Sequence, residues 1–256
     1  MTRNKLILLL LAAFAMNCMS LLAQQEYESG PQGRSGHSQK ELRDSISKLS
    51  QSIERYPGNV ELRLRKAALN VELEQWSFAL DEYSNVLDLQ PENLTALYYR
   101  GFVNYHLARY SFARKDYETL LRVDNRNMHA MMGLVLTNTA DGRLKEAFDG
   151  ANHLVTVFPD VAEVYEVRAE VEERMNLFDA AADDMEKAIV MEERNNSWAG
   201  KTAVSVEDDM FLYQLYAFSL YVKLGKKKQA QKCLDYLVKR GIAKAMLIDY
   251  YAQLKR

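Results

Sequence analysis

Residues 94–127 read LTALYYRGFVNYHLARYSFARKDYETLLRVDNRN, and this 34-residue stretch is one copy of a pattern that recurs along the chain. An alanine occupies the same place in four successive copies: Ala79, Ala113, Ala147 and Ala181. A bulky residue precedes each alanine at a constant interval: Trp76, Tyr110, Leu144 and Phe178. The turns follow the same period, with Pro57, Pro91, Asn125, Pro159 and Glu193. A repeat of this length predicts a stack of helical hairpins.

The four copies span residues 60–93, 94–127, 128–161 and 162–195, and each reads as a helix, a short turn and a second helix. In the second copy, Leu97 and Gly101 lie on one stripe of the first helix, while Ala113 and Tyr117 lie on the inward stripe of the second. A short side chain at the crossing point allows the two helices to approach closely. The alanine of each copy is therefore predicted to lie where the hairpin closes.

These copies resemble tetratricopeptide repeats through the following residues: Ala67, Trp76, Ala79, Tyr83, Pro91, Gly101, Tyr110, Ala113, Tyr117, Tyr165, Ala169, Phe178, Ala181 and Ala188. The resemblance covers residues 60–195 and implies an all-α, right-handed superhelical solenoid with capping helices at both ends. Three positions depart from the family pattern. Arg63 replaces a large apolar residue, Val135 replaces a small one and Ala151 replaces an aromatic, so we expect the first and third copies to pack less regularly.

Oppositely charged residues stand sixteen positions apart in three copies: Lys66 with Glu82, Arg100 with Asp116, and Arg168 with Asp184. This spacing places a cation on one helix opposite an acid on its hairpin partner. A pair that recurs with the repeat is explained by the hairpin, so we interpret these as structural ion pairs rather than as acid–base catalytic groups.

The start of the chain is typical of a secretory signal peptide at 1–23, with Arg3 and Lys5 before an apolar run and cleavage expected after Ala23. The alternative is a lipoprotein anchored through Cys18, but Met16 and Asn17 are poor matches to the small residues that such processing uses. We expect an exported protein, periplasmic or extracellular, because no later apolar run is long enough for a transmembrane segment. Residues 24–37 are rich in Gln, Gly and Ser and predict a flexible leader.

The flanks of the repeats should complete the stack. Residues 38–57 predict an N-terminal capping helix, 196–207 an insertion loop, 208–241 a degenerate fifth hairpin, and 242–256 a C-terminal capping helix. Residues 211–256 hold 10 Lys+Arg against 2 Asp+Glu, and Lys226, Lys227 and Lys228 form a basic patch. This patch is interpreted as solvated, with contact to an anionic envelope surface as the alternative. Nucleic acid is not expected as a partner of an exported chain.

The sequence carries none of the usual signatures of catalysis or metal binding. His37, His106, His129 and His153 lack metal-ligand spacing, and Cys233 would be the one cysteine left after cleavage. We interpret Cys233 as a small buried hydrophobe. There is no Gly-rich phosphate loop and no serine elbow. We therefore expect no enzyme activity, no metal and no cofactor.

One stripe of the second copy is a candidate binding surface, because Tyr98, Phe102 and Tyr105 recur at i, i+4 and i+7 with Tyr99 and His106 beside them. The resemblance implies that this stripe lines the concave groove of the solenoid, which would extend to His129 and Met132 in the third copy. The fourth copy turns acidic through Glu163, Glu166, Glu170 and Glu173. A ligand with an apolar segment followed by a basic one would suit this surface.

The function we expect from these residues is a non-catalytic scaffold of the bacterial cell envelope that binds a protein or peptide in its groove. Two alternatives stay open from the sequence. The aromatic residues could instead pack against neighbouring helices or a chain terminus, or they could hold a glycan or cell-wall polymer by stacking. A carboxylate clamp is not supported, because Leu64, Ala68, Tyr99, His129 and Gly133 stand where such clamps carry Lys, Asn and Arg.

Overall fold

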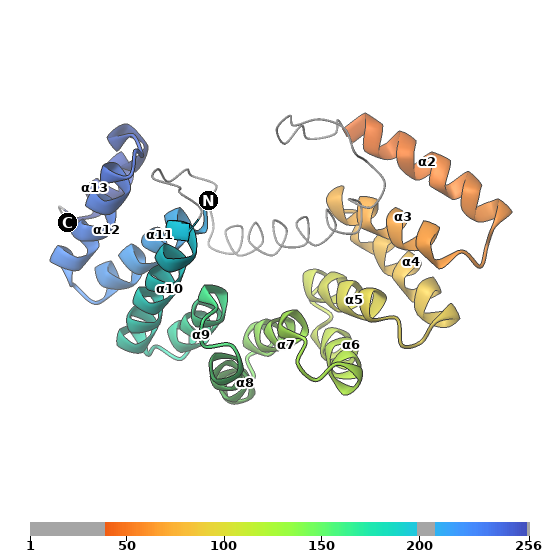
Figure 1. The fold of residues 1–256 in the computed structure, drawn as a ribbon, viewed down its shortest axis with the longest axis horizontal. Helices are drawn as coiled ribbons and strands as arrows, with labels where there is room; N and C mark the ends of the chain where they lie inside the picture. The colour runs from red at the N-terminus through yellow and green to blue at the C-terminus, as the bar shows by residue number, and fades with distance from the viewer. Residues whose placement is uncertain (1–38, 199–207, 255–256) are drawn as a thin grey trace. The chain divides into compact units, whose positions relative to one another are not determined.

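The computed structural model describes residues 39–198 and 208–254 of the 256-residue chain (Figure 1). The expected signal peptide, the leader and most of the expected loop at 196–207 lie outside these residues. Within them, every regular element is a helix and no strand occurs, so the all-α prediction is confirmed. None of the helices in these two ranges combines the length and the hydrophobicity needed to cross a membrane. The chain divides into two compact units, Met1–Pro91 and Glu92–Arg256.

The first unit contains three described helices: α2 (Gln39–Arg55), α3 (Val60–Glu72) and α4 (Trp76–Leu89). Helices α3 and α4 form a hairpin, and α2 packs against α3. Leu42 and Ile53 are the buried residues of α2, and they cover the first hairpin as a capping helix would. Their burial removes apolar surface that α3 would otherwise expose.

The second unit contains the remaining elements: α5 (Leu94–His106), α6 (Tyr110–Val123), α7 (Met128–Ala140), α8 (Leu144–Val157), α9 (Ala162–Arg174), α10 (Phe178–Trp198), α11 (Asp209–Lys223), α12 (Lys227–Lys239), the 3₁₀ turn η1 (Lys244–Leu247) and α13 (Ile248–Leu254). Consecutive helices pack in order, and α7 also contacts both α5 and α9. Figure 1 shows α5, α7 and α9 in one row, with α6 and α8 on the other side of this unit. We call the side lined by α5, α7, α9 and α11 the first-helix face.

The first helix of three hairpins begins at an asparagine: Asn59, Asn93 and Asn127. The side-chain Oδ1 of each asparagine accepts a hydrogen bond from the backbone N–H three residues later. The N···O distance is 3.1 Å in the first hairpin, 2.9 Å in the second and 3.0 Å in the third. Such a cap satisfies a backbone donor that would otherwise have no partner in the helix. The fourth hairpin breaks this pattern, because Val161 at the same position offers no side-chain acceptor.

The end of each first helix is closed by one residue with a left-handed backbone: Glu74 (φ 55°), Ala108 (φ 55°), Gly142 (φ 79°) and Asn176 (φ 62°). The N–H of the following residue then donates to a carbonyl five residues back, as from Arg109 to Asn104 at 2.8 Å. This closure reverses the chain into the second helix. Gly142 has no side chain and adopts this conformation without a steric cost. Glu74 and Ala108 have a Cβ, so they carry local strain.

The hairpins close over the repeated alanines, because Ala79, Ala113, Ala147 and Ala181 are all 0% exposed. In the second hairpin, a Cβ placed on Gly101 would lie 2.9 Å from the ring of Tyr117. In the third hairpin the sizes are exchanged, because Val135 fills the place of the small residue and a Cβ on Gly150 would lie 2.9 Å from its Cγ2. The larger Val135 is therefore accommodated by the missing side chain of Gly150, and Val135 is 2% exposed in a packed interior.

All three predicted ion pairs form. Lys66 Nζ lies 2.9 Å from Glu82 Oε1, Arg100 Nη2 lies 2.6 Å from Asp116 Oδ1, and Arg168 Nε lies 2.5 Å from Asp184 Oδ2. The unusual Arg63 also serves this pattern, since its Nη1 lies 3.0 Å from Glu82 Oε2. The acids of these pairs are buried while the cations stay partly exposed.

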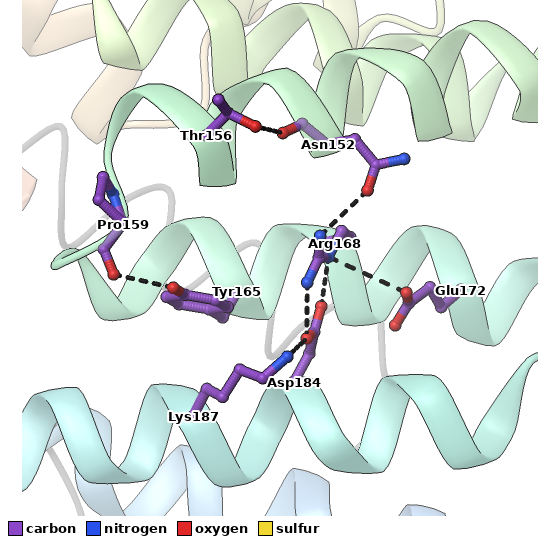
Figure 2. A network of polar contacts seen from close by, with 8 residues as sticks. All are labelled: Asn152, Thr156, Pro159, Tyr165, Arg168, Glu172, Asp184 and Lys187. Atoms are coloured by element: carbon purple, nitrogen blue, oxygen red, sulfur yellow. Dashed lines mark hydrogen bonds and ion pairs between the residues drawn. The ribbon is translucent and has the colours of Figure 1, made fainter.

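The pair in the fourth hairpin belongs to a wider network, shown in Figure 2. Arg168 of α9 binds Asp184 of α10 through two nitrogens and also donates to Asn152 Oδ1 of α8 at 3.0 Å. Lys187 donates to the same Asp184 at 2.9 Å. The network joins the second helix of the third hairpin to both helices of the fourth, so it fixes the stacking of neighbouring hairpins as well as the closure of one.

The C-terminal part differs from the sequence prediction at two places. Helix α10 continues to Trp198, three residues into the segment that we expected to be a loop. The predicted continuous helix from Ile242 to Leu254 is instead the turn η1 followed by α13. Gly241 (φ 101°) closes α12 there, and Leu247, which is 0% exposed, fastens the turn to the core before α13 begins.

Candidate functional site: the first-helix face of the second unit

The aromatic residues predicted on α5 form a connected group of rings that reaches α7. The ring centroid of Tyr98 lies 5.1 Å from Tyr99 and 6.3 Å from His129 of α7, both with edge-to-face geometry. Edge-to-face pairs at these separations stabilise one another. The structure therefore brings Tyr98, Tyr99 and His129 together, as the sequence predicted.

A second group of rings lies one turn further along α5. Phe102 is 4.3 Å from His106, and Tyr105 is 5.7 Å from His106, measured between ring centroids. Burial lowers the pKa of His106 to about 4, and burial also lowers the pKa of His129. Both imidazoles are thus neutral at physiological pH. The rings of α5 and α7 form an uncharged surface.

These residues differ in how far they reach solvent. Tyr99 is 4% exposed and Phe102 is 3% exposed, so both are buried. Tyr98, Tyr105, His106, His129 and Met132 retain partial exposure. Tyr98, Tyr105 and His106 of α5 and His129 and Met132 of α7 are therefore available for contact, whereas Tyr99 and Phe102 are not.

Tyr117 of α6 belongs to this site, although the sequence assigned it only to the interior of its hairpin. A Cβ on Gly133 of α7 would lie 2.5 Å from the Cζ of Tyr117, and the Tyr117 centroid lies 6.0 Å from that of Tyr98. The ring thus reaches between α5 and α7 and supports Tyr98 from behind. In the sequence, the feature that could have indicated this position of Tyr117 is Gly133, whose missing side chain leaves room for the ring.

The acidic residues predicted on α9 lie on the same face. Glu163, Glu166 and Glu170 are partly exposed. Burial, followed by the charges of Glu170, Asp209 and Glu163, raises the pKa of Glu166 to about 8. Burial first and then the charge of Glu170 raise the pKa of Tyr105 on α5, so Glu170 is the acid of α9 whose charge acts on the aromatic residues of α5.

Helix α11 supplies residues that sequence reasoning missed. Tyr213 is 1% exposed, and burial followed by the charges of Glu166, Glu163 and Asp209 raises its pKa. The charge of Asp209 also contributes to the raised pKa values of Glu163 and Glu166. The repeat gave no register for α11, because the segment before it interrupts the 34-residue period.

Glu173, another predicted acid of α9, is buried and paired within the fold. It is 5% exposed, its Oε2 accepts from the hydroxyl of Tyr216 at 2.9 Å, and its Oε1 pairs with Lys223 Nζ. Both partners lie on α11. Glu173 thus joins α11 to α9 through Tyr216 and Lys223.

The predicted basic patch is divided between two roles. Lys226 Nζ lies 2.6 Å from Asp179 Oδ1 of α10, so this lysine joins the fifth hairpin to the fourth. Lys227 and Lys228 are exposed. The ion pair of Lys226 weakens the interpretation of all three lysines as a contact for an anionic surface.

Known proteins with a similar structure share the repeat architecture. A tetratricopeptide repeat protein from Parabacteroides merdae matches with a TM-score of 0.63 and 20% identity, over 85% of this chain and 79% of that one. The chain has the tetratricopeptide-repeat fold. A tetratricopeptide repeat protein of Thermus thermophilus matches at a TM-score of 0.58 and 17% identity, over 77% of this chain and 100% of that one.

PilW, described as a widely conserved type IV pilus biogenesis factor, matches this tetratricopeptide-repeat fold at a TM-score of 0.63 and 13% identity. The match covers 77% of this chain and 85% of PilW. In sequence, no model of a known family and no curated protein matches the chain.

In this tetratricopeptide-repeat fold the first-helix face offers two kinds of contact. Its neutral rings can cover apolar side chains, and its carboxylates can accept hydrogen bonds from cations. Within residues 39–198 and 208–254, no group of three or more His, Cys, Asp and Glu residues is placed to hold a metal ion. Cys233 is buried, and burial followed by the charge of Glu186 raises the pKa of its thiol to about 12, so it is protonated and unreactive.

Proposed function

We propose that this protein is a non-catalytic scaffold that binds a protein or peptide along the first-helix face of its second unit. The observation that carries the proposal is the row of neutral aromatic rings on α5 and α7 beside the carboxylates of α9. Tyrosine rings combine apolar area with a hydroxyl, and they are enriched where proteins bind one another. Partly exposed Tyr98 and Tyr105 are the contacts that we expect to matter most.

A peptide suits this surface better than a glycan does. The ring of Tyr98 is inclined by 77° to Tyr99 and by 61° to His129, so the rings form no common plane on which a sugar could lie. Tilted rings can instead pack against the apolar side chains of a peptide. We therefore propose a peptide ligand and treat glycan binding as an outcome that the experiment distinguishes.

The experiment is affinity purification from the native host, with the captured partner identified by mass spectrometry and then made in pure form. We expect the pure partner to bind the wild-type chain, and we expect Tyr98→Ala with Tyr105→Ala to abolish binding while the helical circular dichroism stays unchanged. The matched control is Phe112→Ala, which removes an aromatic that is 61% exposed on α6, outside the first-helix face. Equal binding by both variants would refute the assignment. Capture that survives protease treatment of the lysate would indicate a glycan.

We also propose that the protein acts in the bacterial cell envelope after export. The support is the sequence of residues 1–23. A second support is PilW, a protein of the same fold that is described as a type IV pilus biogenesis factor. The test is the mass of the protein recovered from the host: we expect a chain that begins at Gln24, whereas a lipid on Cys18 would indicate anchoring and an intact Met1 would refute export.

A further inference from the structure

We propose that the C-terminal end of the chain lies against an anionic lipid bilayer, through exposed lysines on and after α12 and two exposed apolar side chains beside them. We call this surface the basic face, and it consists of the following residues: Lys228, Lys232, Lys239, Lys244, Met246 and Ile248. The inference goes beyond the peptide contact proposed for the first-helix face. It uses no residue of that face and does not depend on it.

The first support is a stripe of lysines along α12. Lys228, Lys232 and Lys239 stand at i, i+4 and i+11, which places them within about 40° of one another around the helix axis. All three are exposed. The stripe faces away from the core, because the buried residues of α12 lie on the opposite side of the helix: Ala230, Cys233, Leu234 and Leu237.

The fold does not neutralise this stripe. Within residues 39–198 and 208–254, none of its three lysines forms an ion pair or a side-chain hydrogen bond, whereas Lys226 just before them pairs with Asp179. Asp235 lies on the same side of α12, and its Oδ1 accepts hydrogen bonds from Gln231 Nε2 at 2.7 Å and from the hydroxyl of Tyr251 at 3.3 Å. One carboxylate against three ammonium groups leaves the stripe positively charged.

The second support is a pair of exposed apolar side chains that follow α12. Ile248 is 66% exposed and Met246 is 56% exposed, whereas Leu247 between them is 0% exposed and holds this turn against the core. The burial of Leu247 therefore keeps its two neighbours in solvent. Neighbouring apolar side chains that are held out in this way indicate a surface that contacts another molecule.

Tyr251 of α13 connects these apolar side chains with the lysine stripe. Its hydroxyl donates to Asp235 of α12, and Lys244 Nζ lies 5.2 Å from the centre of its ring. Ile248 precedes Tyr251 by three residues and so lies beside it on α13. Helices α12 and α13 pack against each other at the C-terminal end of the chain (Figure 1). The basic and the apolar residues thus form one surface.

A bilayer suits this combination better than a small anion or an acidic protein does. The three lysines of α12 extend over about 17 Å along the helix, which is farther than one small anion can bridge. A bilayer offers many headgroups to lysines that are spread out, and an apolar layer just below them for Met246 and Ile248. An acidic protein would need its own charges at matching positions, and it is the alternative that the experiment tests.

The experiment is sedimentation of the chain from Gln24 onward with lipid vesicles. This chain keeps every described residue and removes the apolar run of residues 1–23, whose own insertion into lipid would mask the effect. At about 0.1 M salt, we expect it to sediment with vesicles of phosphatidylglycerol and phosphatidylcholine in equal parts, but not with phosphatidylcholine alone. At about 1 M salt, where the screening length falls to about 3 Å, binding should weaken strongly.

Two triple variants test which lysines matter. Lys228→Gln, Lys232→Gln and Lys239→Gln together should weaken binding to the anionic vesicles on the order of a hundredfold. The control should bind like the wild type, and it removes the same charge from exposed positions on α2, α6 and α8: Lys48→Gln, Lys115→Gln and Lys145→Gln. An equal loss in both variants would show a general effect of net charge and would overturn the basic face.

The apolar contact has a readout of its own in tryptophan fluorescence. When anionic vesicles are added, the emission of Ile248→Trp should move to shorter wavelength relative to the wild type, because this side chain enters the headgroup region. The emission of Phe112→Trp, at an exposed position on α6, should not move. Met246→Ser with Ile248→Ser should weaken binding about tenfold.

Two results would overturn the bilayer contact: no binding to anionic vesicles, or an unshifted emission from Ile248→Trp. Capture of an acidic protein in place of lipid would overturn it in favour of that partner. Each of these results leaves the proposed peptide contact untouched, because no residue of the first-helix face is changed.

Discussion

Replacing Gly133 with alanine should destabilise the second unit, although alanine is the better helix former. A Cβ at this position would lie 2.5 Å from Cζ and 2.8 Å from Cε1 of Tyr117, which is closer than carbon atoms approach in proteins. Tyr117 is 2% exposed, and a Cβ on Gly101 would also lie 2.9 Å from its ring, so α5 and α7 both leave the ring little room to shift. Overpacking of this kind costs about 3 kcal/mol.

Against this cost stands a gain of about 1 kcal/mol in helix propensity from glycine to alanine. The net loss is about 2 kcal/mol, and in a domain of this size it lowers the melting temperature by about 4 to 8 °C. The assay is thermal and urea unfolding followed by circular dichroism. The control is Gly58→Ala, where a Cβ meets nothing within 4 Å, and we expect a change within about 0.5 kcal/mol there.

The decisive comparison repeats Gly133→Ala in a chain that already carries Tyr117→Leu. Leucine lacks the outer ring atoms that the new Cβ would touch, so the same substitution should now stabilise by about 1 kcal/mol. The sign of the effect should reverse between the two backgrounds. If Gly133→Ala is neutral or stabilising with Tyr117 present, the ring does not lie between α5 and α7, and the support of Tyr98 by Tyr117 is refuted.

Three further predictions concern stability and can be measured in the same unfolding assays. Val161→Asn should supply the N-cap that the fourth hairpin lacks and stabilise by about 0.5–1 kcal/mol, and no gain would show that the extended backbone there does not allow the cap. Ala108→Gly should stabilise by about 1 kcal/mol, because Ala108 has φ 55°, whereas the same change at the helical Ala113 should destabilise. The raised pKa of Glu166, about 8, favours its protonated form in the fold, so stability should fall as pH rises from about 4.5 through 8. Glu166→Gln should therefore exceed the wild type by about 1–2 kcal/mol at pH 9, after discounting for partial exposure, and match it near pH 4; equal curves would refute the shift.

Much of the fold could be predicted from the sequence because each hairpin is a local structure. The 34-residue period marks the crossing alanines, and the sixteen-residue spacing of Arg100 and Asp116 follows from one helix turning back on the other. Such contacts depend on residues close in the chain. The ring stripe on α5 was predictable for the same reason, since Tyr98, Phe102 and Tyr105 follow the helical period.

The packing of Val135 inside the third hairpin needed the structure. From the sequence, Val135 and Ala151 were two separate departures from the repeat, and each suggested looser packing. The structure shows that Val135 is accommodated by Gly150, whose missing side chain leaves room for it, and this depends on volume rather than on the repeat pattern. The partial loss of the predicted stripe, with Tyr99 and Phe102 buried, is likewise decided by what surrounds each ring.

The sequence by itself determined the repeating hairpin and its internal ion pairs, because those interactions join residues at fixed and short separations along the chain. Tertiary structure decided how the fifth hairpin meets the fourth. Tyr216 and Lys223 reach Glu173 across 43 and 50 residues, and Lys226 reaches Asp179 across 47. No period connects those positions, so only the folded chain brings α11 against α9 and joins the two through Glu173.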